Sequence, residues 1–312
     1  MYVIRGRINI VPRFREAVVT IGNFDGVHRG HQAIFSRLLD LSRRHGGAPK
    51  VVITFEPHPR RFLGNDPSMA RIIPLRSKIA RLDGAGIDAV LILRFNRDLA
   101  TLSAEQFVQR TLVAGLAVRE VLVGENFRFG SGGEGNLESL RRMGRQLGFG
   151  VHGQPLMRVG DTVISSSMIR AVVGQGDLDR AGILLGRPFS MEGRVVHGER
   201  RGRAMGFPTA NIPACNMLHP PLGVWIVKVW LEGVAYRGVA NLGVNPTFGL
   251  GGRRLETHLF GFSGDLYRRW LRVEFLKFLR PERKFSGIDE LRERIAEDVR
   301  LAKRYFADGP EV

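Results

Sequence analysis

The feature that most constrains this fold is an alternation of short apolar runs with amphipathic segments, which continues to about residue 185. Continuous apolar runs are typical of strands that are buried on both faces of a parallel sheet. Between them, residues 31–45 have helical periodicity and stop at Gly46-Gly47, while Ser103 to Gln106 form a capping box that starts another helix. This half is therefore predicted to be an open α/β domain with right-handed crossovers. The four predicted strands are residues 18–21, 51–55, 90–93 and 121–123.

The pattern changes after Gly186-Arg187-Pro188, where strand-like runs follow one another with no helix-length segment between them. Such runs, separated by Gly and Pro, predict antiparallel strands that close into a small barrel or sandwich. One long helix ends the chain, with Ser286 as its expected cap and apolar residues from Ile288 to Ala302 on one face. The predicted boundary gives one domain over residues 1–186 and a second over residues 187–312. The predicted strands of the second domain are residues 224–230, 237–242, 255–260 and 271–278.

The composition is that of an ordinary soluble protein with a strong positive charge. Lys and Arg number 47 against 30 acidic residues, giving a net charge of +17, which attracts anions. The basic residues are dispersed, with pairs such as Arg43-Arg44 as the longest runs, so no nucleic-acid partner is expected. The single cysteine, Cys215, cannot form an intrachain disulfide, and no signal peptide or membrane-length apolar run is visible. A cytoplasmic protein without a membrane partner is the prediction.

The most informative segment runs from Gly22 to His31, directly after the first predicted strand and at the start of the first predicted helix. Ligands of α/β sheets bind at the carboxyl ends of the strands, and a helix N-terminus offers unpaired N–H groups to phosphate. His28 and His31 are three residues apart, so both can donate hydrogen bonds to phosphate oxygens as charge shifts in a transition state. Two alternatives are a metal-binding pair, which lacks a recognisable third ligand, and a structural histidine pair.

The segment G-x-F-D-G-V-H-x-G-H-Q resembles the signature of nucleotidylyltransferases, and specifically of prokaryotic bifunctional riboflavin kinase/FMN adenylyltransferases (FAD synthetases). Residues 54–59, 124–130 and 164–170 are similar to that family's next segments, in its order. The resemblance implies a Rossmann-like nucleotidylyltransferase domain in which His28, His31 and Asn126 are catalytic. It implies that ATP is bound by Gly22, Asn23, Phe24, Asp25, Gly26, Gly30, Ser166, Ser167 and Arg170, and the flavin by His58, Pro59, Phe62 and Phe127.

Four of these residues have ordinary structural alternatives. Ser166 and Ser167 can be a simple helix cap, and His58 and Phe62 can be a loop histidine and a core phenylalanine. The chain also departs from the family pattern, since Ser167 replaces Thr and Val163 stands where a basic residue is usual. Loss of a cation there would weaken adenylylation unless another arginine compensates.

In the second half, residues 193–211 combine glycines with basic residues and end in Pro208-Thr209-Ala210-Asn211. Such a loop can fold over phosphates, and Thr209 and Asn211 offer oxygen ligands to Mg²⁺, although spacing alone is equally typical of a surface turn. The segment resembles the riboflavin kinase signature G-x-x-x-G-R-x-x-G-F-P-T-A-N, which implies an antiparallel β-barrel kinase domain. By that resemblance, Thr209 and Asn211 hold Mg²⁺, and ATP is bound by Gly198, Gly202, Arg203, Gly206, Phe207 and Pro208.

The same resemblance makes Glu256 the general base that faces the ribityl hydroxyl of riboflavin, although an isolated Glu in a strand is usually a solvent-facing residue. Val244-Asn245 departs from the commoner Thr-Arg of the family. The resulting hypothesis is ATP-dependent phosphorylation of riboflavin to FMN, followed by adenylylation of FMN to FAD with release of pyrophosphate. The alternatives are an enzyme with one competent module and a flavin- or RNA-binding regulator without turnover. The sequence indicates no oligomeric state.

Overall fold

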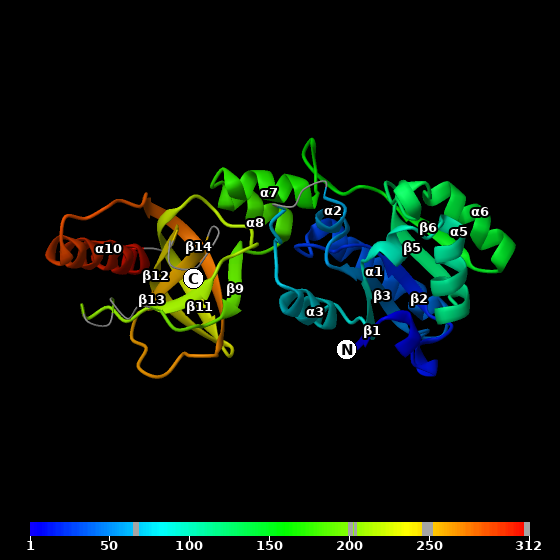
Figure 1. The fold of residues 1–312 in the computed structure, drawn as a ribbon, viewed down its shortest axis with the longest axis horizontal. Coiled ribbons are helices and arrows are strands. Elements are labelled where there is room, and N and C mark those ends of the chain that lie inside the picture. Colours follow the sequence, from blue (N-terminus) through cyan, green and yellow to red (C-terminus); the bar gives the residue numbers. More distant parts are fainter. Residues whose placement is uncertain (65–68, 199–201, 203–204, 245–251, 309–312) are drawn as a thin grey trace. The chain divides into compact units, whose positions relative to one another are not determined.

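The computed structural model describes residues 1–64, 69–198, 202, 205–244 and 252–308. These residues form two compact units (Figure 1). The first unit contains Met1–Met69 and Leu75–Ser166, and the second contains Ala70–Pro74 and Ser167–Val312.

The first unit contains a six-stranded parallel sheet, in the order β1-β4-β3-β2-β5-β6. Adjacent residues such as Val18 and Val19 are both fully buried, because helices cover both faces of the sheet. The continuous apolar runs therefore predicted four of the six strands and their parallel pairing correctly, whereas residues 2–5 and 150–154 were not predicted as strands. The strands are β1 (Tyr2–Arg5), β2 (Val18–Ile21), β3 (Lys50–Glu56), β4 (Ala89–Arg94), β5 (Glu120–Gly124) and β6 (Gly150–Gln154).

Two helices of the first unit were predicted from the sequence. The first was expected from His31 and begins two residues earlier, at Arg29, and the second begins at Ala104, directly after the predicted cap Ser103. His28 is the N-cap of α1, and Ser103 caps α5 in a capping box with Gln106. Helix α5 continues directly into a nine-residue π-helix, η3, whose Leu112 and Leu116 are fully buried in the core. The helices are α1 (Arg29–Arg44), α2 (Pro59–Phe62), α3 (Leu75–Gly84), α4 (Arg97–Ala100), α5 (Ala104–Phe107), η3 (Val108–Leu116) and α6 (Leu137–Leu147), with short turns η1 (Arg7–Asn9), η2 (Pro12–Phe14) and η4 (Ser131–Gly133).

A two-stranded hairpin, β7 (Arg158–Val159) and β8 (Thr162–Val163), precedes helices α7 (Ser166–Gly174) and α8 (Leu178–Leu185). The second unit then forms a six-stranded antiparallel sheet in the order β10-β13-β12-β11-β14-β9. A backbone bridge between Val196 and Asn211 joins the two ends of this order, so the sheet closes into a small barrel. The strands are β9 (Ser190–Arg194), β10 (Ala210–Pro213), β11 (Gly223–Leu231), β12 (Val234–Val244), β13 (Arg253–Leu259) and β14 (Trp270–Arg280).

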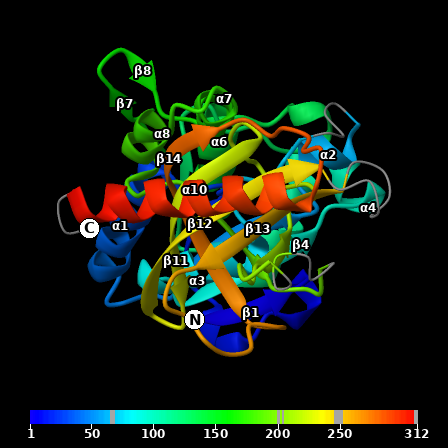
Figure 2. The ribbon, with the colours of Figure 1, turned by 90° about the vertical axis from the view of Figure 1, so that its left-hand side faces the viewer.

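The terminal helix α10 (Ile288–Asp308) lies across the outer face of the barrel strands (Figure 2). Val299 and Ala302 are buried against Ile226 and Val239 of the sheet, as the apolar face of the helix predicted. Ile288, which belongs to that predicted face, is 72% exposed. No helix among the described residues is long and apolar enough to cross a membrane.

Candidate functional site

The segment from Gly22 to His31 follows β2, the strand at which the order of the first sheet reverses. The chain runs from β2 to β3 and β4 on one side, and β5 and β6 lie on the other side. Crevices at such reversal points, outside the carboxyl ends of the strands, are the usual ligand sites of open α/β sheets. The turns after β3 and β5, which contain His58 and Asn126, begin at the same edge, so the sheet brings these predicted residues together.

The turn between β2 and α1 has an unusual backbone. Phe24 and Val27 have φ angles of 48° and 44°, and Gly26 has 84°. A positive φ is strongly disfavoured for a β-branched residue such as Val, and such strain is concentrated at functional sites. A Cβ atom on Gly22 would lie 3.0 Å from the ring of Phe24, so the tight fold of this turn needs glycine there.

His28 and His31 form a stacked pair at the N-terminus of α1. Their ring centroids are 3.5 Å apart, and the planes differ by 19°. Nδ1 of His28 accepts the backbone N–H of His31 at 3.4 Å, which leaves Nε2 as the N–H donor of a neutral His28 ring. The ring of Phe24 supports His31 edge-on, at 5.1 Å. A Cβ on Gly30 would approach the His28 ring to 3.2 Å, so glycine makes room for the pair.

A buried lysine supports this turn, and the motif analysis missed it. Lys78 of α3 is 4% exposed, and its Nζ donates to the carbonyl oxygen of Asn23 at 2.8 Å. Thr54 of β3 donates to the same oxygen at 3.2 Å, and Nζ lies 3.8 Å from Glu56. No motif marks Lys78 in the sequence, since the contact joins residues 55 positions apart.

Ser166 hydrogen-bonds to the same turn from a distant part of the chain, since its hydroxyl donates to the carbonyl oxygen of Asp25 at 2.9 Å. Ser167, the next residue, is exposed, and Nε of Arg170 donates to the carbonyl of Ala70 at 2.9 Å within the second unit. Val163 pairs directly with Arg158 across the β7–β8 hairpin. Directly opposed residues share a face of the hairpin. Arg158 therefore lies on the same face as Val163, which stands where the family usually has a cation.

The residues predicted for the flavin follow β3 and β5. Nδ1 of His58 accepts the backbone N–H of Arg60 and caps the short helix α2, whose first residue is Pro59. Phe62 is 43% exposed, which excludes the alternative that it is a core residue. Phe127 stacks on Phe129 at 5.4 Å, so its ring is held in one orientation. Asn126 is exposed. Its side-chain Oδ1 lies close to Gly124, since a Cβ added to that glycine would lie only 3.2 Å from it.

In the second unit, strand register brings the predicted kinase residues together. Asn211 of β10 lies directly opposite Glu256 of β13, and Asn241 of β12 is opposite Glu256 on its other side. Arg254 is 5% exposed, donates to Oδ1 of Asn211 at 3.2 Å, and lies 3.9 Å from Glu256. Arg254 and Asn241 were not predicted from the sequence, since an isolated Arg or Asn in a strand carries no motif signal.

These side chains line a cavity of about 550 Å³, which is within the range of small-molecule sites. Thr209, Asn211 and Glu256 lie on its wall, together with the apolar side chains of Val239 and Leu291. The cavity therefore combines a carboxylate, oxygen donors and an apolar surface within one unit.

The predicted phosphate loop packs tightly against this wall. A Cβ on Gly198 would lie 2.5 Å from the Asn211 amide, and one on Gly202 would lie 2.4 Å from the carbonyl of Phe207. His258 packs edge-on against Phe207 at 5.7 Å, and its Nδ1 lies 2.9 Å from the carbonyl of Pro208. Gly206 has a φ of 87°, which favours glycine. Arg203 and Asn245 lie outside the described residues.

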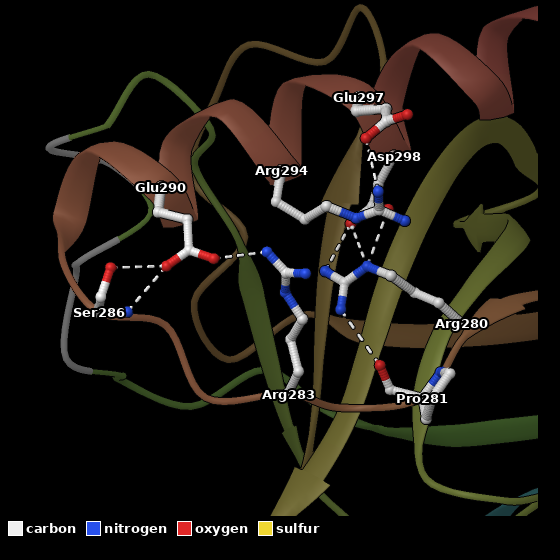
Figure 3. A network of polar contacts seen from close by, with 8 residues as sticks. All are labelled: Arg280, Pro281, Arg283, Ser286, Glu290, Arg294, Glu297 and Asp298. Carbon is white, nitrogen blue, oxygen red and sulfur yellow. Dashed lines mark hydrogen bonds and ion pairs between the residues drawn. The ribbon is translucent and has the colours of Figure 1, made fainter.

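A polar network holds the segment between β14 and α10 (Figure 3). Nη2 and Nε of Arg280 donate to the carboxylate of Asp298, which is 2% exposed, with the shortest contact at 2.7 Å. The carboxylate of Glu290 accepts the backbone N–H and the hydroxyl of Ser286, both at 2.8 Å, and also pairs with Arg283. The Ser286 backbone N–H, then its hydroxyl, hold the pKa of Glu290 below its usual value. The sequence predicted that Ser286 caps α10 directly. In the structure its hydroxyl instead donates to the side chain of Glu290 in the first turn of that helix.

The donor set fits Mg²⁺. Within the described residues, no group of three or more His, Cys, Asp or Glu side chains is arranged to hold a metal. Mg²⁺ takes few protein ligands because it keeps several waters and binds substrate phosphates. Thr209 and Asn211 supply two neutral oxygens on the cavity wall, and the amide oxygen that accepts from Arg254 has a second lone pair.

Comparison with known families gives two adjacent matches. The model of the FAD synthetase family matches residues 11–168, and that of the riboflavin kinase family matches residues 185–306. The chain is 42% identical over 308 residues to the bifunctional riboflavin kinase/FMN adenylyltransferase of Pseudomonas fluorescens, covering 98% of each chain. It is 40% identical to that of Escherichia coli K12, again over 98% of each chain, and 39% identical to that of Haemophilus influenzae, over 98% of this chain and 99% of the relative.

A solved structure from Streptococcus pneumoniae, described as a macrolide-efflux protein, has a similar fold. It superimposes with a TM-score of 0.82 at 29% identity, and the match covers 97% of this chain and 99% of that one.

Proposed function

The chain belongs to the bifunctional riboflavin kinase/FMN adenylyltransferase family, and from this membership we propose which residues carry out its two reactions. The enzyme phosphorylates riboflavin to FMN with ATP, and then transfers an adenylyl group from ATP to FMN, giving FAD and pyrophosphate. The observation that carries the kinase assignment is the register of β10 and β13, which pairs Asn211 with Glu256 on one cavity wall.

For the kinase reaction, Glu256 is the general base that takes the proton of the riboflavin 5′-hydroxyl. Arg254 is a positioning residue, because it contacts both Asn211 and Glu256. Thr209 and Asn211 would hold Mg²⁺, which neutralises phosphate charge as the γ-phosphoryl group moves. Gly198, Gly202, Arg203, Gly206, Phe207 and Pro208 are proposed to bind ATP. Orientation of the hydroxyl toward the γ-phosphorus and electrostatic stabilisation together account for most of the acceleration.

For adenylylation, the FMN phosphate attacks the α-phosphorus of ATP. His28 and His31 donate to the phosphate oxygens as charge develops, with Asn126 as a further donor. The supporting geometry is the stacked pair at the N-terminus of α1, where the helix dipole favours the same negative charge. Gly22, Asn23, Phe24, Asp25, Gly26, Gly30, Ser166, Ser167 and Arg170 are proposed to bind ATP. His58, Pro59, Phe62 and Phe127 are proposed to contact the flavin.

The pairing of Arg158 with Val163 favours two competent modules over one, because it supplies a cation on the face where the family has one. A cytoplasmic location and the absence of a nucleic-acid partner stay predictions of the sequence.

Two variants test the assignment by separating the activities. His28→Ala should abolish FAD formation and leave riboflavin phosphorylation nearly intact, whereas Glu256→Gln should do the reverse when FMN is supplied. Chromatography of riboflavin, FMN and FAD over time measures both activities in one incubation with ATP and Mg²⁺. Omission of Mg²⁺ should stop FMN formation.

A surface substitution serves as the control. Glu232→Gln removes an exposed carboxylate paired with Arg269. It should keep both activities, since exposed pairs contribute little. Loss of both activities in a folded His28→Ala or Glu256→Gln protein would contradict the two-site assignment.

A further inference from the structure

A second cavity in the barrel unit lies on the outer face of β11, β12 and β14, beside the C-terminal half of α10. Its volume is about 730 Å³, so it is the larger of the two cavities described here. Figure 2 shows α10 lying across these strands. The cavity is lined by residues that have no part in the proposed reactions, among them Lys228, Arg237 and Lys277.

The three cations are held close together by strand register. Lys228 and Arg237 are directly opposite each other on β11 and β12, and Lys277 pairs with Ile226 on the other side of β11. Like charges directly opposite one another destabilise a sheet. Among the described residues, none of the three makes a salt bridge. Glu274 of β14 lies directly opposite Lys228 on its other side but pairs with Arg272, and Asp308 is the acidic residue on the cavity wall. The walls therefore have an excess of positive charge that a bound anion would neutralise.

Aromatic rings hold the cationic groups in place. The guanidinium of Arg237 lies 5.3 Å from the ring centroid of Phe306, and Nζ of Lys277 lies 5.7 Å from that of Tyr305. Nζ of Lys228 lies 5.0 Å from the Trp230 ring. Both Tyr305 and Phe306 of α10 line the cavity, so the same space offers cations and aromatic rings. Cations beside aromatic rings are suited to ligands that combine an anionic group with a planar ring.

This cavity is separate from the one that contains Glu256, because the two share no lining residue. Helix α10 contributes to both cavities. Its residues Leu291 and Ile295 line the kinase cavity, and Leu301 and Tyr305 line the second cavity, called the outer cavity below. The kinase reaction therefore leaves the three outer cations unused.

We propose that the outer cavity is a second ligand site, which binds a phosphorylated planar ring compound, either an adenine nucleotide or a phosphorylated flavin. Lys228, Arg237 and Lys277 hold the phosphate, and the ring lies against Tyr305. The volume is within the range of sites for ligands of this size. The site is independent of the proposed catalytic assignments.

The test is hydrogen exchange of the full chain, read by peptide, with ADP, FMN or inorganic phosphate added separately. Binding should slow exchange in residues 226–237 and 301–308. The variant K228Q/R237Q should lose this protection and keep the protection of residues 209–211 and 255–257 that line the kinase cavity. Equilibrium dialysis should show that the outer site is weakened about tenfold or more for each cation removed. The control R110Q/R145Q removes the same charge from two exposed arginines of the first unit and should behave as wild type.

Protection by ADP alone or by FMN alone would support the proposal and identify the source of the phosphate. Equal protection by inorganic phosphate would overturn the ring-binding part, because it would show a simple anion site. Absence of protection in the wild-type protein, or its persistence in K228Q/R237Q, would overturn the proposal altogether. If the double variant fails to fold, K277Q changes one exposed side chain and provides the same comparison.

Discussion

The two catalytic regions are built in different ways. The candidate adenylylation site is centred on one continuous segment, in which a strand, a strained turn and a helix N-terminus follow each other within residues 18–31. The candidate kinase site is assembled from β10, β12 and β13, which meet through strand register. A local site depends on backbone conformation, whereas a register-built site depends on cross-strand neighbours. Substitutions of supporting residues should therefore act differently in the two regions.

The largest expected effect concerns the stability of the barrel unit. Asp298→Asn leaves the buried guanidinium of Arg280 without its carboxylate, and breaking a buried ion pair in this way costs about 3 kcal/mol. Tryptophan fluorescence during urea unfolding measures this unit selectively, because all three tryptophans, at 225, 230 and 270, lie in it. Glu293→Gln, an exposed change on the same helix, is the control. Equal stability of Asp298→Asn and wild type would mean that this pair does not stabilise α10.

The next effect tests the register-built site. Arg254→Met removes the cation that contacts both Asn211 and Glu256, so riboflavin phosphorylation should fall on the order of 10–100-fold, as for other residues that orient ligands. Adenylylation of supplied FMN should be unchanged. The adjacent exposed residue provides the control Arg253→Met. A loss in Arg253→Met equal to that in Arg254→Met would show that general charge, and not the contacts of Arg254, matters.

The corresponding change in the local site should be smaller. Lys78→Met removes one of two donors to the carbonyl of Asn23, while Thr54 keeps the other. Adenylylation should fall by about tenfold, the scale of one hydrogen bond to a charged group, and kinase activity should not change. Arg76→Met, an exposed change on the same helix, should have little effect. An unchanged adenylylation rate in Lys78→Met would indicate that the turn holds its shape without this support.

The smallest effect is a pH dependence of barrel stability. Burial lowers the pKa of His219 more than its hydrogen bond to the carbonyl of Pro220 raises it. Between the lowered pKa and about 6.5, the unfolded chain binds more protons than the folded one, so stability falls as the pH drops through this window. His219→Gln should flatten the dependence of tryptophan-monitored unfolding between about pH 5 and 7. An unaltered slope would assign the dependence to other groups.

The local site was largely predictable from the sequence. Apolar runs predicted four of the six strands of the first sheet, and the Gly22–His31 segment predicted a ligand turn at the carboxyl end of β2. These features depend on neighbours in the chain, so a pattern of residue types reveals them. The strained φ angles of Phe24 and Val27 were not predicted, because neither residue type favours them.

The register-built site was predictable only through family resemblance. Glu256 alone resembled any solvent-facing residue in a strand, and nothing in the sequence around Arg254 or Asn241 indicated that they flank it. Strand pairing joins residues that are 45 positions apart in the case of Asn211 and Glu256. A shift of one residue would turn these side chains to the opposite face.

The sequence by itself determined the two kinds of fold, the turn after β2 and the residue types proposed for both reactions, because these follow from local periodicity and from motifs that are continuous in the chain. The tertiary structure decided which side chains support them. Lys78 reaches Asn23, Arg254 reaches Asn211, and three cations meet on the outer face of the barrel, because packing and strand register join residues far apart in sequence.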